Sequence, residues 1–163
     1  MLIGLISDTH DNLPQVRKAV EYFNGANVDL VFHAGDIISP FNLQEYKKLK
    51  ARVVFVFGNN DGEKYMWRSI VKEIGEVHEV FYEARMEELA VLMMHEPWQI
   101  DALAESQKFD IIIHGHTHKP AVMHIGKTAI INPGECGGWV SGKSTVGLLE
   151  LPSKKFELIE LRI

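Results

Sequence analysis

Aspartate, histidine and asparagine side chains recur at five points of this sequence, each directly after a run of apolar residues. Carboxylates, imidazoles and amide oxygens are all metal ligands. This mixture of nitrogen and oxygen donors suits Mn²⁺, Fe, Co, Ni or Zn²⁺ better than Ca²⁺ or Mg²⁺. The sequence therefore predicts a site for one of these metals. The five points are Asp8-Thr9-His10, Gly35-Asp36, Gly58-Asn59-Asn60-Asp61, His95 and His114-Gly115-His116-Thr117-His118.

Five predicted strands carry these polar clusters at their carboxyl ends. Continuous apolar runs are typical of strands that are covered on both faces, as in parallel sheets. The carboxyl ends of such strands converge on one crevice of an open α/β sheet, so we expect the five clusters to share one site. The strands are predicted at Leu2–Ile6, Val28–His33, Arg52–Phe57, Leu89–Met94 and Asp110–His114.

Helices are predicted after each of the first three strands. The first has Pro14 in its first turn and is expected to end at Asn24-Gly25. Ser39-Pro40 fits the start of a second helix, with the serine as N-cap. Asp61 is placed to cap a third helix that continues to about Lys72.

The second half of the chain is predicted to be rich in strands. A short helix is expected at Ile100–Ser106, and Gly126-Lys127 fits the turn of a hairpin. The last two strands alternate apolar and polar residues, as half-exposed strands do. Together the two halves predict an α/β domain with two sheets. The additional strands are Val77–Tyr82, Val122–Ile125, Thr128–Ile131, Thr145–Leu151 and Lys155–Leu161.

Length and composition restrict the class of protein. The 163 residues, 46% hydrophobic and 24% charged, fit one globular domain, 1–163. The net charge of −5 argues against nucleic acid as a stable partner, and no apolar run is long enough to span a bilayer. The single cysteine, Cys136, fits a reducing compartment. Without a signal-peptide pattern at its start, the chain is expected to be cytoplasmic. The sequence leaves assembly into a homo-oligomer open.

The number of candidate ligands indicates two metal ions. Seven side chains are too many for one ion that keeps an open position, but suit two ions that share a carboxylate. Two ions roughly 3.5–4 Å apart can clamp the attacking and leaving oxygens of a phosphoryl transfer and ionise a bridging water near neutral pH. The seven are Asp8, His10, Asp36, Asn59, His95, His116 and His118.

The order of these clusters resembles a known family. D-x-H, G-D, G-N-x-[D/E], a lone histidine after a strand and G-H-x-H form the signature of the calcineurin-like metallophosphoesterases. The segments HAGD, HGHTHKP and NPGE are similar to those of the small YfcE-type phosphodiesterases of archaea and bacteria. The resemblance covers Met1 to about Glu135. It implies an α/β fold of four layers, in which two mixed β-sheets are sandwiched between helices.

The resemblance also implies roles for the seven side chains. Asp8, His10 and His118 would hold one metal. Asn59, His95 and His116 would hold the other, and Asp36 would bridge both. The cofactors implied are two divalent ions, Mn, Ni, Co, Fe or Zn. The implied activity is divalent-metal-dependent hydrolysis of a small phosphodiester by a metal-bridging hydroxide.

Two positions depart from the family pattern. In many members the residue after the motif asparagine is a histidine that protonates the leaving alcohol, but here it is Asn60. Asn60 is neither an acid nor a base at neutral pH, so it stands on the leaving-group side without supplying a proton. General-acid catalysis is typically worth about 10²–10⁴-fold, and we therefore expect a preference for good leaving groups, such as aryl phosphodiesters. Glu96 follows His95 where a glycine is common, and Trp98 offers an apolar surface for substrate.

Alternative interpretations follow from the same residues. Taken singly, Asp8, Asp36 and Asn59 are more often turn or cap residues, but their joint order favours a site. His33 and His114 are expected to orient ligands by hydrogen bonds.

Other functions also remain. One is a non-catalytic protein-interaction scaffold, as in the retromer subunit of the same fold, and another is a phosphomonoesterase. Residues 137–144 match a nucleotide-binding loop, G-x-x-x-x-G-K-[ST]. The strand pattern that follows argues against it, because such a loop must precede a helix.

Overall fold

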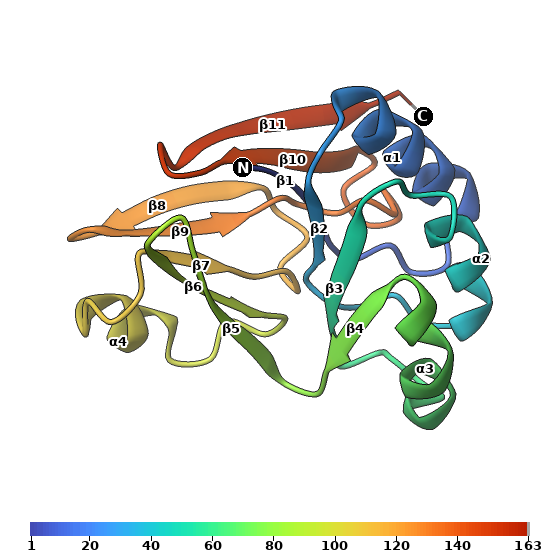
Figure 1. Cartoon of the computed structure of the whole chain (residues 1–163), viewed down its shortest axis with the longest axis horizontal. Helices are drawn as coiled ribbons and strands as arrows, with labels where there is room; N and C mark the ends of the chain where they lie inside the picture. The colour runs from blue at the N-terminus through green and yellow to red at the C-terminus, as the bar shows by residue number, and fades with distance from the viewer. Residues whose placement is uncertain (163) are drawn as a thin grey trace.

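In the computed structural model of the protein, which describes residues 1–162, two β-sheets pack face to face (Figure 1). The larger sheet has six strands in the order β11-β10-β1-β2-β3-β4, and the smaller has five in the order β5-β6-β7-β9-β8. Both sheets are mixed. The parallel strands have antiparallel neighbours on one side in the larger sheet and on both sides in the smaller one. The strands are β1 (Leu2–Ile6), β2 (Leu30–His33), β3 (Arg52–Val56), β4 (Gly75–His78), β5 (Phe81–Met86), β6 (Leu89–Met94), β7 (Ile111–Ile113), β8 (Ala121–Ile125), β9 (Thr128–Asn132), β10 (Ser144–Glu150) and β11 (Lys155–Leu161).

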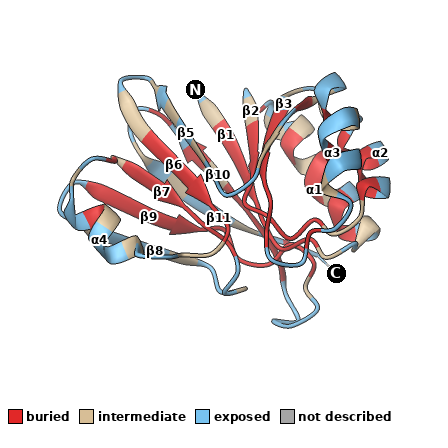
Figure 2. Ribbon diagram, turned by 90° about the horizontal axis from the view of Figure 1, so that it is seen from below, coloured by how far each residue is buried: buried red, intermediate tan, exposed pale blue. Residues whose placement is uncertain are grey.

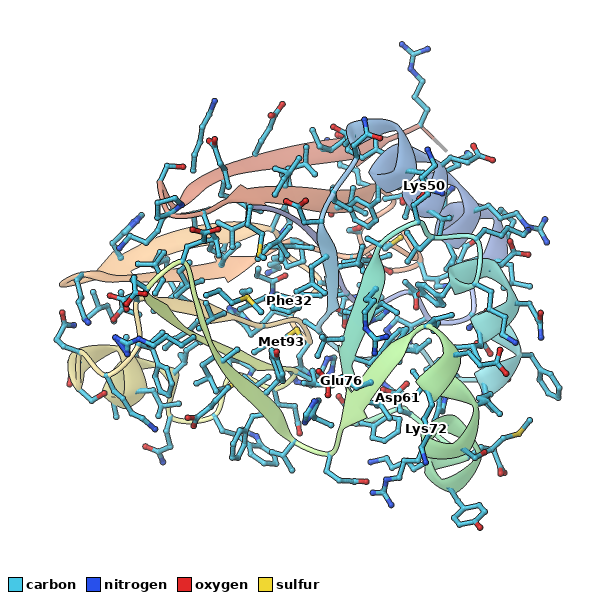
Figure 3. All side chains as sticks on the ribbon, in the orientation of Figure 1. Phe32, Lys50, Asp61, Lys72, Glu76 and Met93 are labelled. Carbon is cyan, nitrogen blue, oxygen red and sulfur yellow. The ribbon has the colours of Figure 1, made fainter. Side chains whose placement is uncertain are left out.

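Three apolar layers hold these sheets and the helices together. Helices α1 (Leu13–Ala26), α2 (Leu43–Tyr46) and α3 (Lys64–Ile70) cover the outer face of the larger sheet. Phe32 and Met93, both labelled in Figure 3, belong to the layer between the sheets. Helix α4 (Ile100–Glu105) packs on the outer face of the smaller sheet. Figure 2 shows the strands largely buried and the helices exposed on their outer sides. The predicted four-layer α/β fold is therefore confirmed.

The first helix ends later than predicted. It continues through Gly25 to Ala26, and Asn27 ends it in the left-handed conformation, with φ at 52° and its backbone N–H bonded to the Phe23 carbonyl. Asparagine tolerates this conformation, so it replaces the expected glycine as the terminating residue. The predicted start at Ser39-Pro40 is confirmed, because the Ser39 hydroxyl accepts a hydrogen bond from the backbone N–H of Phe41 at 3.3 Å. This segment begins as the 3₁₀ turn Pro40–Asn42 and continues as α2.

The predicted strand Val77–Tyr82 was wrong, because the chain changes sheets within it. Strand β4 pairs with β3 in the larger sheet, whereas β5 pairs with β6 in the smaller one. No glycine or proline marks the crossing at Glu79-Val80, so the apolar alternation continued across it. The hairpin around Gly126-Lys127 is as predicted, with Ile125 opposite Thr128.

Two further expectations concern nucleotide binding and membrane-spanning helices. Residues 137–143 lead into strand β10 and not into a helix, which removes the setting that a nucleotide-binding loop requires. Among residues 1–162, no helix is long and apolar enough to cross a membrane.

Candidate metal centre

Five loops converge where the carboxyl ends of the central strands of both sheets meet. The loops after β1, β2 and β3 come from the larger sheet, and those after β6 and β7 from the smaller one. Five of the seven predicted ligands have φ values between 41° and 68°. Each non-glycine residue in this left-handed region costs roughly 1–2 kcal/mol, so the surrounding structure must hold the loops in place. The five are Asp8, His10, Asp36, His116 and His118.

Asp8, His10, Asp36 and His118 form the first group of predicted ligands. Each offers one ligand atom, and these atoms all lie within 4.8 Å of one another. The His118 Nε2 atom is 3.4 Å from Asp8 Oδ1, and the His10 Nε2 atom is 3.5 Å from Asp36 Oδ2. The two imidazole rings stack with their centroids 5.0 Å apart. This group has the spacing of a metal site.

Asn59, His95 and His116 form a second group on the other side of Asp36. The Asn59 Oδ1 atom lies 3.0 Å from His95 Nε2 and 2.9 Å from His116 Nδ1. The His95 Nε2 atom is 3.4 Å from Asp36 Oδ2. The same carboxylate oxygen therefore faces a histidine of each group, and the structure brings all seven predicted side chains together.

The hydrogen bonds of His95 show that a cation fits between these groups. Its Nδ1 atom lies 2.7 Å from the Ala34 carbonyl oxygen. A carbonyl only accepts hydrogen bonds, so Nδ1 carries a proton. In neutral His95 the Nε2 atom then presents a lone pair toward the oxygens of Asn59 and Asp36. Three atoms with lone pairs, namely His95 Nε2, Asn59 Oδ1 and an Asp36 oxygen, then face one another. They require a positive charge between them, either a proton or a metal ion.

Burial and charge at the two carboxylates support the same conclusion. Asp8 and Asp36 are almost fully buried, and burial raises the pKa of Asp8. Burial also opposes ionisation of Asp36, but hydrogen bonds from His95 and Asn60 outweigh it and lower the pKa of Asp36. Although burial opposes protonation of His95, Asp36 and Asp8 raise its pKa. The buried Nε2 atom of His10 has no hydrogen-bond partner. Buried carboxylates with unpartnered imidazoles match the ligand chemistry of divalent ions.

Asn60 makes its polar contacts with Asp36. Its backbone N–H donates to Asp36 Oδ1 at 2.9 Å, and its side-chain amide donates to Asp36 Oδ2 at 2.7 Å. The residue itself is exposed at the edge of the site. Asn60 therefore orients the Asp36 carboxylate, a role that the sequence did not indicate.

Asp61 does not cap a helix, contrary to the prediction. Helix α3 begins at Lys64, after Glu63 in the left-handed conformation. The Asp61 carboxylate, labelled in Figure 3, instead accepts hydrogen bonds from four backbone amides. It thereby joins the loop after β3 to the loop that carries Asp36. Close approach of these loops also requires Gly58, because a Cβ atom there would overlap the Asp36 side chain. The donors are Gly58 at 2.6 Å, Ile37 and Ile38 at 2.7 Å each, and Asp36 at 3.1 Å.

Glu135 is a third residue whose role the sequence did not indicate. Its buried carboxylate lies 3.4 Å from His118 Nδ1 and accepts the backbone N–H groups of Val140 and Ser141. Burial opposes its ionisation, but the amide hydrogen bonds outweigh burial and lower its pKa. The Glu135 carboxylate therefore faces the ring of His118 as a negative charge, although no hydrogen bond joins the two side chains. The only signal in the sequence was the segment NPGE, which ends at Glu135.

His33 and His114 lie outside the two groups, as expected. The His33 Nδ1 atom accepts a hydrogen bond from the Gly35 backbone, and Nε2 lies 3.3 Å from the Thr9 hydroxyl. Complete burial lowers the pKa of His33 to about 3, so the ring is neutral at pH 7. His114 Nδ1 lies 3.4 Å from the Asn132 side chain. Both rings support the loops that carry the predicted ligands.

Comparisons with known proteins agree with this geometry. The calcineurin-like phosphoesterase superfamily domain matches residues 1–154. A phosphodiesterase from Methanocaldococcus jannaschii is 37% identical over 165 aligned residues, covering 99% of both chains. A solved structure of an archaeal phosphodiesterase has a TM-score of 0.93 at 36% identity, covering 99% of this chain and 100% of the other.

A more distant structure shares the fold alone. Vps29 from Entamoeba histolytica, solved with zinc, has a TM-score of 0.72 at 20% identity, covering 98% of this chain and 99% of that one. The predicted resemblance is confirmed by the domain match and by the archaeal relatives over almost their whole length. The chain belongs to the calcineurin-like phosphoesterase superfamily.

Proposed function

We propose that this protein is a divalent-metal-dependent phosphodiesterase that acts on a small phosphodiester through two metal ions. The observation that carries the proposal is the position of Asp36. Its Oδ2 atom lies 3.5 Å from His10 Nε2 and 3.4 Å from His95 Nε2. One carboxylate oxygen thus stands between two sets of nitrogen and oxygen donors, as two ions with a shared ligand require. We propose further that residues 1–163 act as one cytoplasmic domain.

Each group of donors would hold one ion. Asp8, His10 and His118 would hold the first, while Asn59, His95 and His116 would hold the second. Asp36 would be shared. The donor set suits Mn, Ni, Co, Fe or Zn. Two such ions would supply positive charge for the phosphoryl oxygens and a water that ionises near neutral pH to attack phosphorus.

The chain's own contacts would keep these donors in position. The two hydrogen bonds from Asn60 hold the Asp36 carboxylate. The backbone N–H of His116 lies 3.2 Å from both oxygens of the Asp8 carboxylate. Asn60 supplies no proton to a leaving alcohol, so turnover should depend strongly on the leaving group. Aryl phosphodiesters are therefore the expected substrates.

Hydrolysis of bis(p-nitrophenyl) phosphate, with Mn²⁺, Ni²⁺ or Co²⁺ added, tests the proposal. We expect metal-dependent turnover of this diester that exceeds turnover of p-nitrophenyl phosphate. Asp36→Asn should abolish it, while Asp101→Asn, at an exposed position in α4, should not. Absence of turnover with every metal would favour the protein-interaction scaffold, and a preference for the monoester would favour a phosphomonoesterase.

A further inference from the structure

A cavity of about 600 Å³ opens beside the metal centre, on the outer face of the smaller sheet. Helix α4, which has six residues, covers part of this face and contacts β8 and β9. The cavity lies beside this helix, over the part of the sheet formed by β5 and β6, and Leu103 of α4 forms part of its wall. Its volume is within the range of small-molecule sites.

The cavity is continuous with the candidate metal centre. Asn59 and His95, which belong to the second group of predicted ligands, form part of its wall. Asn60 does not line it. In the proposed reaction Asn60 stands on the leaving-group side, so the wall of the cavity does not include the residue expected beside the leaving group.

The remaining wall combines apolar and aromatic side chains with charged ones. Phe81 and Trp98 line the cavity and are 53% and 63% exposed, so their rings are accessible. Three residues of the wall are acidic. Glu83 pairs with Lys108 and Glu79 with Arg68, whereas Glu96 forms no ion pair among residues 1–162.

A cation also faces this space. The Lys64 ammonium group lies 5.1 Å from the centre of the Phe57 ring. Among residues 1–162, it has no carboxylate partner within 4.0 Å. The cavity therefore suits an apolar, flat group attached to an anion.

We propose that this cavity binds the ester group that stays on phosphorus after cleavage, and that this group is aromatic. The inference rests on the proposed phosphodiesterase function. A phosphodiester has two ester groups, of which one leaves and the other can occupy the cavity. A phosphomonoester has no second group, so the cavity gives a physical reason for selecting diesters. A phenyl ring and a nucleobase share this flat aromatic chemistry, and both can stack on Phe81 and Trp98.

Three diesters with the same leaving group, p-nitrophenolate, test the proposal. They are methyl p-nitrophenyl phosphate, phenyl p-nitrophenyl phosphate and the p-nitrophenyl ester of thymidine 5′-phosphate. Each kcat/KM is divided by the rate of alkaline hydrolysis of the same diester, which removes differences in intrinsic reactivity. We expect the phenyl ester to exceed the methyl ester by about tenfold or more, as for a ring that enters an apolar site. The nucleoside ester distinguishes a nucleobase from a simple aryl group as the preferred occupant.

Trp98→Ala should lower the phenyl-to-methyl ratio to near one. Phe41→Ala is the matched control, because Phe41 is an aromatic residue, 79% exposed, that does not line the cavity. It should keep the wild-type ratio. A wild-type ratio near one, or a high ratio that survives Trp98→Ala, would overturn the inference.

Calorimetry gives a readout that does not depend on turnover. Diphenyl phosphate should bind at least about tenfold more tightly than dimethyl phosphate, and Trp98→Ala should remove this difference. Equal affinities for the two phosphates in the wild-type protein would contradict the cavity assignment. If none of the three p-nitrophenyl esters is hydrolysed, the proposed function fails, whereas hydrolysis of all three without preference refutes only the cavity assignment.

Discussion

Replacement of Asp61 by asparagine tests how the two central loops of the site are held together. The carboxylate is 8% exposed. One of its oxygens accepts from the amides of Ile37 and Ile38, and the other from those of Asp36 and Gly58. Asparagine has the same shape but only one accepting oxygen. Asp61→Asn therefore leaves two buried amides without an acceptor.

The size of the effect follows from these contacts. A buried amide without an acceptor costs about 1–3 kcal/mol, so two of them cost about 2–6 kcal/mol. Burial raises the pKa of Asp61 in spite of the amide hydrogen bonds, which means that the ionised carboxylate is itself costly to bury. Neutral asparagine avoids this cost. We therefore expect the free energy of unfolding to fall by the lower part of the range, about 2–3 kcal/mol.

Urea denaturation of wild-type and variant proteins at pH 7 measures this difference. Asp29→Asn is the control, since Asp29 is exposed and accepts one backbone amide, that of Leu2. Its effect should stay below about 1 kcal/mol. The reasoning is refuted if Asp61→Asn lowers the free energy of unfolding by no more than Asp29→Asn does. A drop in metal-dependent turnover that exceeds the loss of folded protein would show that Asp61 also keeps Asp36 in position relative to Asn59.

Three other predictions concern the site and the loop before β10. Asn60→His should raise turnover of diesters with poor leaving groups, because an imidazole can donate the proton that Asn60 lacks; unchanged turnover of an alkyl diester would contradict this. Glu135→Gln should weaken Mn²⁺ affinity by about 10–100-fold, since the carboxylate behind His118 is lost, and an unchanged affinity in a chelator competition would refute the role. No tight ATP binding is expected by calorimetry, and binding that disappears on Lys143→Ala would show a nucleotide loop after all.

Much of the fold was predictable because the local signals agreed with the tertiary structure. The continuous apolar runs at Leu2–Ile6 and Leu89–Met94 form strands that are covered on both faces. The crossing between β4 and β5 was not predictable. Whether the strand continues or changes sheets at Glu79-Val80 depends on its pairing partners. Strand β4 pairs with the earlier β3, whereas β5 pairs with β6, which follows it directly. Alternation of apolar residues looks the same in both cases.

The grouping of the candidate donors was predictable from the sequence, whereas the residues that support them were not. A metal restricts its ligands to a few side-chain types, so Asp8, Asp36 and the histidines stand out in the sequence. The residues that hold these donors in place often do so by contacts with backbone amides, and several residue types can make such contacts. The contact of Glu135 with His118 joins the loops after β9 and β7. The segment NPGE marks Glu135 in the sequence, but local sequence does not show which side chain it contacts.

The candidate donors follow strands of two different sheets, so the distances between them depend on how the sheets pack against each other. Asp8 and Asp36 follow strands of the larger sheet, whereas His95 and His116 follow strands of the smaller one. Hydrogen bonds cross this boundary directly, from His95 Nδ1 to the Ala34 carbonyl at 2.7 Å and from the His116 amide to Asp8. Close-packed interiors resist small displacements, so the apolar layer between the sheets fixes the distance between the donor groups. Substitutions in that layer should therefore alter metal affinity even where they lie far from any donor.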